Sequence, residues 1–476
     1  MKKSDTRKAL PDFTKGPIIK ALISLSIPIV FANILQTAYQ LVDTFWVGRL
    51  GAEAVAAVSL SFPFLFLLIS LAGGLAIAGT IMVSQYKGKG DIEQVDYISA
   101  QTLMMMFIVG IIVSIIGYFL SAPLMHFMGA EGDVLPAATS YLQISFVGLV
   151  FMFGFFIYQS LMRGVGDVKT PLFIVFGTVL LNLVLDPLFI LGWGPIPAYG
   201  VTGAALATIG TQGLATIIGI ALLMSGKQGI HLKASNMKPD FSLMKKMFFL
   251  GFPASISQST RALGMMLMTF LVASFGTVVV ASYGIGGRIL SFIIIPAVGL
   301  AMATSTLVGQ NIGAGKIDRA AKISKTSSLI SFALLSAVGV LVFLFAEPLT
   351  AAFIPDDTEV IQSGSQFVKI MALTFGFIGI QQTINGTLMG SGNTKMSMIL
   401  SLITLFIVQF PFAYILSKHT TLGFEGIYWA FPITNIIMAI GTVIWFSKGS
   451  WKKKNITEDP TIGQVVEETI IEEGAQ

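Results

Sequence analysis

Four oxygen-bearing side chains lie in otherwise apolar stretches of the first half of the sequence. Asp43 and Asp186 are the only acids that lie within predicted helices and away from the loop ends, and Asn182 lies one helical turn before Asp186. At about 1.5 Å of helical rise per residue, these three and Thr208 lie toward the same side of the membrane. Hard oxygen ligands suit a small hard cation such as Na⁺, and two close carboxylates also suit a proton. We predict that these four residues bind a cation, with ordinary interhelical hydrogen bonding as the alternative.

A polar stripe lies along one face of the first apolar stretch, because its members recur at spacings of three, four and three residues. The stripe consists of Asn33, Gln36, Gln40 and Asp43. The equivalent positions in the second half are Gln258, Arg261, Met265 and Met268. Together with Gln159, all of these except Asp43 form the predicted substrate cavity. Methionine adapts to varied apolar shapes, so the cavity would suit amphipathic organic cations, although plain packing is the alternative role.

Composition identifies the elements that must position these residues. Apolar residues make up 54% of the 476-residue chain and charged residues only 11%, which indicates a polytopic membrane protein. Apolar stretches long enough to cross a bilayer lie at 21–46, 53–82, 97–121, 136–162, 170–193, 199–224, 245–274, 278–307, 326–346, 360–389, 396–417 and 426–447. The predicted fold is therefore all-α with twelve transmembrane helices. Pro28 interrupts the backbone hydrogen bonding of the first helix and is its predicted bend.

The two halves of the sequence repeat each other at an offset of 223–226 residues. Val83-Ser84-Gln85 returns as Val308-Gly309-Gln310, and Gly74-Leu75-Ala76 returns as Gly299-Leu300-Ala301. Six helices per repeat predict two lobes with the same topology, related by a pseudo-two-fold axis along the membrane normal. The predicted domains are an N-terminal tail (1–20), an N-lobe (21–224), a linker (225–244), a C-lobe (245–447) and a C-terminal tail (448–476).

Basic residues concentrate in the two tails and in alternate loops, which predicts that both termini are cytoplasmic. This topology accounts for the net charge of +5, so we expect no nucleic-acid partner. The expected surroundings are the lipid bilayer of a prokaryotic plasma membrane, and the expected state is a monomer.

Several motifs together resemble the multidrug and toxic compound extrusion (MATE) family. They are Ala32-Asn33 and Val42-Asp43-Thr44, Val83-Ser84-Gln85, Gly164-Val165-Gly166-Asp167, Asn182 with Asp186-Pro187, and Val308-Gly309-Gln310-Asn311-Ile312-Gly313-Ala314-Gly315. The resemblance covers roughly residues 15–450. It implies an antiporter that exports cationic or amphipathic compounds by alternating access, driven by Na⁺ or H⁺ and without a cofactor.

The confinement of the acids to the first lobe resembles the pattern of the DinF-type prokaryotic branch of this family, whereas the NorM-type pattern has acids in the second lobe. By this likeness Asp43, Asn182, Asp186 and Thr208 would form the cation site, with the backbone of Ala204 contributing. A lipid-linked oligosaccharide flippase of the same superfamily is the alternative, because Arg261 and Arg288 could hold a phosphate. An enzyme is not expected, because the three histidines fall in loops and the sequence has no cysteine.

Overall fold

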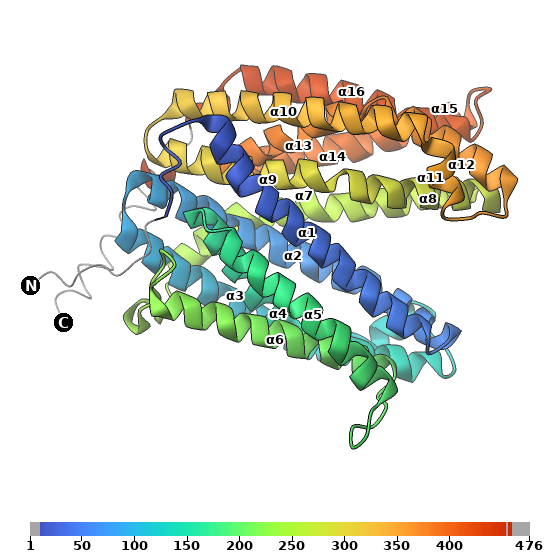
Figure 1. The fold of residues 1–476 in the computed structure, drawn as a ribbon, viewed down its shortest axis with the longest axis horizontal. Coiled ribbons are helices and arrows are strands. Elements are labelled where there is room, and N and C mark those ends of the chain that lie inside the picture. The colour runs from blue at the N-terminus through green and yellow to red at the C-terminus, as the bar shows by residue number, and fades with distance from the viewer. Residues whose placement is uncertain (1–9, 454–455, 459–476) are drawn as a thin grey trace, which may run out of the picture. The chain divides into compact units, whose positions relative to one another are not determined.

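The computed structural model describes residues 10–453 and 456–458, and their regular structure is helical (Figure 1). The first half contains α1 (Ile18–Gly48), α2 (Ala52–Lys89), α3 (Ile92–Phe127), α4 (Val134–Val165), α5 (Lys169–Leu191) and α6 (Val201–Ser225). The second half contains α7 (Phe241–Ala273), α8 (Thr277–Ile293), α9 (Ile295–Gly313), α10 (Ile317–Leu344), α11 (Ala346–Ala351), α12 (Thr358–Ala372), α13 (Phe375–Gly390), α14 (Thr394–Leu402), α15 (Phe410–Lys418) and α16 (Glu425–Ser447). A π-helical segment, Ile403–Gln409, joins α14 to α15.

Each predicted span corresponds to one helix or to one interrupted helix. Among the described residues, nine helices are long and apolar enough to cross a membrane, if the α14–α15 run counts as one. Two further spans are bent pairs, with angles of 41° between α8 and α9 and 54° between α12 and α13. Pro296 in the first turn of α9 explains the first bend, because proline cannot donate the hydrogen bond that would continue α8. The remaining predicted span, 245–274, corresponds to α7, which is not among these candidates and carries Arg261.

The chain forms two compact units, and both α1 and α7 are divided between them. Of the described residues, unit 1 contains 10–12, 31–255 and 456–458, and unit 2 contains 13–30 and 256–453. Unit 2 therefore includes the first part of α1, and unit 1 includes the first part of α7. Both divisions fall two residues after a proline, Pro28 in α1 and Pro253 in α7. The units thus differ from the predicted lobes by an exchange of helix halves.

Two equivalent glycines of the sequence repeat, Gly74 and Gly299, pack against the first parts of α7 and α1 respectively. In unit 1, a Cβ added at Gly74 of α2 would lie only 2.4 Å from the Cα of Ser255 in α7. In unit 2, a Cβ added at Gly299 of α9 would lie 2.4 Å from Cγ2 of Val30 in α1. Only glycine allows helix backbones to approach this closely, so the repeated Gly-Leu-Ala motif has a packing role.

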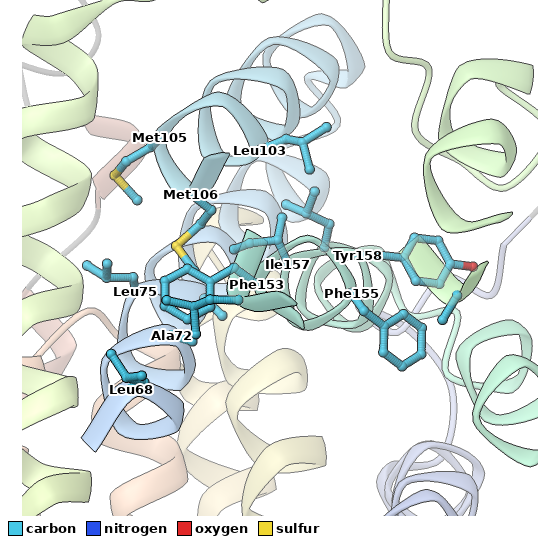
Figure 2. Packing of buried hydrophobic residues seen from close by; sticks show 14 of the residues in the cluster. Leu68, Ala72, Leu75, Leu103, Met105, Met106, Phe153, Phe155, Ile157 and Tyr158 are labelled. Atoms are coloured by element: carbon cyan, nitrogen blue, oxygen red, sulfur yellow. The ribbon is translucent and has the colours of Figure 1, made fainter. Parts of the chain in front are cut away.

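The core of unit 1 lies where α4 packs against α2, α3 and α6 (Figure 2). Leu75 of α2, Met106 of α3 and Phe153 of α4 are each fully buried there. Lipid tails are as apolar as these side chains, so close packing around small residues stabilises the unit. One such contact is at Gly154 of α4, where an added Cβ would lie 2.6 Å from Cγ2 of Thr216. The packing fixes α6 beside α4.

The repeated Gly-x-Gly motifs form the turns after α4 and α13. Gly166 and Gly392 end these helices with positive φ angles of 94° and 78°, which glycine adopts readily. The Asp167 carboxylate then accepts a hydrogen bond from the backbone N–H of Thr170 at 3.1 Å, which caps the start of α5. The motif therefore sets where α5 begins.

Candidate functional site

The start of α6 is held tightly against the end of α5. The backbone N–H of Tyr199 donates to the carbonyl of Phe189 at 3.0 Å, and that of Gly200 donates to Ile190 at 3.1 Å. A Cβ added at Gly203 would lie 2.3 Å from the Phe189 carbonyl oxygen, so only glycine fits there. These contacts bring the polar side chains of α5 and α6 to the same end of unit 1.

Asn182 and Asp186 form a buried pair on α5, as their one-turn spacing predicts. Nδ2 of Asn182 donates to Oδ1 of Asp186 at 2.7 Å, and both side chains are fully buried. This bond fixes the amide orientation, so that the Asn182 oxygen is left as an acceptor. The pair therefore presents one carboxylate oxygen and one amide oxygen to further ligands.

Asp43 reaches the same region from α1, one turn after Tyr39. The Tyr39 hydroxyl forms a hydrogen bond of 2.8 Å with Oγ1 of Thr211, and it also interacts with the side chain of Thr208 on α6. The carboxylates of Asp43 and Asp186 are close enough to repel each other electrostatically. The structure thus brings together the four side chains that the sequence predicts as cation ligands.

Three oxygens in this cluster are buried without a hydrogen-bond donor among the described residues. They are Oδ1 of Asp43, Oδ1 of Asn182 and Oδ2 of Asp186. Leaving a buried acceptor unsatisfied costs about 1–3 kcal/mol each, so such atoms are rare unless they have a further ligand. A small cation would interact favourably with all three, and a proton on either carboxylate would remove the repulsion between the two acids. The donor set therefore fits Na⁺ and H⁺.

The sequence analysis missed Tyr39 and Thr211, which join α1 to α6 beside the acids. Their signal was available, because Tyr39 lies four residues before Asp43 and Thr211 lies three residues after Thr208. Ala204 is buried near the start of α6, and its backbone contribution to the cation site stays a prediction.

The predicted cavity residues of unit 1 have varied exposure. Asn33, Gln36 and Gln159 are half-buried, whereas Gln40 is exposed. Nδ2 of Asn33 is buried without an acceptor among the described residues. The stripe on α1 therefore keeps unused hydrogen-bonding capacity on the same helix as Asp43.

In unit 2 the predicted lining separates into exposed and buried members. Arg261 is exposed, Gln258 is half-buried and Met265 is 56% exposed. Met268, by contrast, is fully buried in the hydrophobic core of unit 2, so it packs and does not line a cavity in this conformation. Pro28 lies inside a continuous α1, and the bend there stays a prediction.

Comparisons with known proteins agree on one family. The MatE family model matches residues 28–188 and 253–415. The probable multidrug resistance protein YpnP of Bacillus subtilis is 31% identical over 93% of this chain and 97% of that protein. A protein of Shewanella oneidensis named FAD transporter is 27% identical over 89% of this chain and 93% of that protein. A crystal structure of MATE in complex with MaL6 aligns with a TM-score of 0.87 and 26% identity, covering 95% of this chain and all of that chain. The predicted fold of twelve membrane-spanning helices in two lobes is confirmed.

Proposed function

Since the chain belongs to the MatE family of multidrug transporters, we propose that it is a Na⁺- or H⁺-coupled antiporter whose coupling cation binds in unit 1. The observation that carries this proposal is the set of three buried oxygens without donors, on Asp43, Asn182 and Asp186. Two negative charges in a membrane-embedded unit are costly unless a cation or proton compensates them. Loading and release of that cation therefore change the charge of unit 1.

The helix α1 connects the cation to the cargo. Asp43 contributes to the cation cluster, while Asn33 and Gln36 lie on the same helical face and would contact the cargo. The first part of α1 belongs to unit 2 and its second part to unit 1. A shift of α1 on cation binding would thus reach both units, which supports alternating access of the cargo to the two sides of the membrane.

The cargo we propose is a small amphipathic molecule, including organic cations, exported across the prokaryotic plasma membrane by a monomer with cytoplasmic termini. The name of YpnP supports drug export. A second relative is named FAD transporter, so membership of the family leaves the charge of the cargo open.

Transport into proteoliposomes with imposed Na⁺ and pH gradients tests the coupling. We expect ethidium to move against its gradient when one of the two cation gradients is imposed, and the Asp43→Asn and Asp186→Asn variants to lose this coupled movement. Asp167→Asn is the matched control, because it removes the same charge from a buried helix cap that retains an acceptor oxygen. Coupled transport that persists in both acid variants would refute the proposal.

A further inference from the structure

Unit 2 carries the opposite charge from the cation cluster inside its helices. Its described acidic residues lie only in first turns of helices or in loops: Asp318, Glu347, Asp356, Asp357, Glu359 and Glu425. Arg261 of α7 and Arg288 of α8 lie well inside their helices. A charge at such a depth does not face hydrocarbon without large cost, so each arginine requires a polar neighbour, water or a ligand.

The two arginines lie at the same level of unit 2. Residues 274–276 form the turn between α7 and α8, so the two helices run in opposite directions away from this turn. Arg261 lies 12 residues before the end of α7 and Arg288 lies 11 residues after the start of α8. At about 1.5 Å per residue, these Cα positions are about 18 Å and about 17 Å from the turn.

Arg261 is held in place by a buried amide. Its Nη2 donates to Oε1 of Gln382 on α13 at 2.7 Å, and the Gln382 side chain is only 7% exposed. A guanidinium has five N–H donors, and this is its single side-chain hydrogen bond to a described residue. Arg261 is therefore fixed but retains donors for a second acceptor.

Arg288 is exposed beside an unfilled surface of α8. Gly284 and Gly287 lie one turn and one residue before it, and a Cβ added at either glycine would meet no atom within 4 Å. Among the described residues, no side-chain hydrogen bond or ion pair engages the Arg288 guanidinium. The absence of side chains at these glycines leaves room for a group that approaches the guanidinium.

We propose that Arg261 and Arg288 form an anion-binding subsite that holds an acidic group of the cargo, such as a phosphate, sulfonate or carboxylate. Arginine suits such planar or multidentate anions because its N–H groups form charge-assisted hydrogen bonds with them. The cargo class is then an amphipathic organic anion or a zwitterion. This inference rests on the proposed function as a transporter and adds a cargo class to it.

The transport test compares carboxyfluorescein, an anion, with ethidium, a cation, in proteoliposomes of phosphatidylcholine. Arg261→Gln, Arg288→Gln and the double variant should lower the ratio of anion to cation transport by about 10-fold or more, as expected for loss of charge-assisted hydrogen bonds. Lys395→Gln is the matched control, because it removes an exposed positive charge of unit 2 from the first turn of α14, and it should keep the ratio of the parent protein. An unchanged ratio in the double variant would overturn the inference.

Direct binding separates the inference from the coupling proposal. Purified protein in phosphatidylcholine nanodiscs should bind carboxyfluorescein, measured by fluorescence anisotropy without any cation gradient. The double glutamine variant should bind it about 10-fold or more weakly, and Arg→Lys variants should retain part of the affinity. Equal dye affinity in the parent protein and the folded double variant would overturn the anion subsite, whatever happens to Asp43 and Asp186 variants in transport.

A second set of nanodiscs distinguishes a soluble acidic cargo from a lipid phosphate. Phosphatidylglycerol that displaces the dye from the parent protein would assign the subsite to a lipid headgroup phosphate. Dye binding that persists in its presence would assign the subsite to soluble anions. In both cases the double arginine variant should lose the binding of the dye or of the lipid. Binding that the double variant retains would contradict the anion subsite.

Discussion

Replacing Asp186 by asparagine should weaken cation binding to unit 1 by about 30- to 150-fold. A unit charge about 4 Å from a bound cation contributes about 4 kcal/mol at an effective dielectric constant of about 20. The fully buried Asp186 side chain keeps one oxygen as asparagine, and the substitution also removes repulsion from Asp43 and the cost of burying a charge. We therefore expect a net loss of about 2–3 kcal/mol, which corresponds to this range of affinity.

Cation-dependent thermal unfolding in detergent measures this loss. A cation at about 100 times its dissociation constant stabilises the folded protein by about 2.7 kcal/mol, whereas after a 30- to 150-fold loss of affinity the same concentration contributes less than about 1 kcal/mol. The melting temperature of the parent protein should rise with Na⁺, or with proton concentration, and that of Asp186→Asn should rise much less. Asp167→Asn should respond as the parent protein does.

The outcome that would contradict this reasoning is a cation response of Asp186→Asn equal to that of the parent protein. The Asn182–Asp186 pair would then be a structural hydrogen bond within α5, and the unsatisfied oxygens would need another explanation. A general loss of stability with an unchanged cation response would lead to the same conclusion.

Two other predictions concern the contacts around the cluster. Gly203→Ala and Gly426→Ala should each destabilise the protein by about 1–3 kcal/mol, because the added Cβ would lie 2.3 Å from Phe189 and 2.4 Å from Leu416 respectively. Only Gly203→Ala should also weaken cation binding, because Gly426 lies in unit 2. Equal effects of the two variants in cation titrations would be inconsistent with the site. Tyr39→Phe should cost about 0.5–1.5 kcal/mol of stability through loss of one hydrogen bond and lower cation affinity less than Asp186→Asn does; an equal loss of affinity would make Tyr39 a direct ligand.

Spacing within one helix was the most reliable guide to the site. The four-residue separation of Asn182 and Asp186 determines that they meet on α5, and their hydrogen bond has the predicted partners. Contacts between different helices were harder to predict from the sequence. The bond between Tyr39 and Thr211 joins residues 172 positions apart, and it depends on how α1 and α6 pack.

Helix rotation and helix exchange could not be predicted from apolar content. Met268 was predicted to line the cavity because it is the repeat equivalent of Asp43, whereas its side chain is fully buried in the core of unit 2. A membrane helix that is apolar all round gives no clear periodicity that would reveal this rotation. The division of α1 between two units depends on the approach of Val30 to Gly299, a contact that only the folded chain defines. The sequence repeat indicated equivalent positions, but it did not indicate which helix halves pack together.

Reciprocal binding of cation and cargo tests the central claim most directly. The cargo dissociation constant should be measured in nanodiscs across a Na⁺ titration at fixed pH and across a pH titration without Na⁺, for the parent protein and for Asp43→Asn. The proposed coupling predicts that one of these cations weakens cargo binding by about 5- to 150-fold, with an equal effect of cargo on the cation, and that Asp43→Asn abolishes both effects. Cargo affinity that stays constant across both titrations would contradict the account and leave the carboxylate cluster without a role in transport.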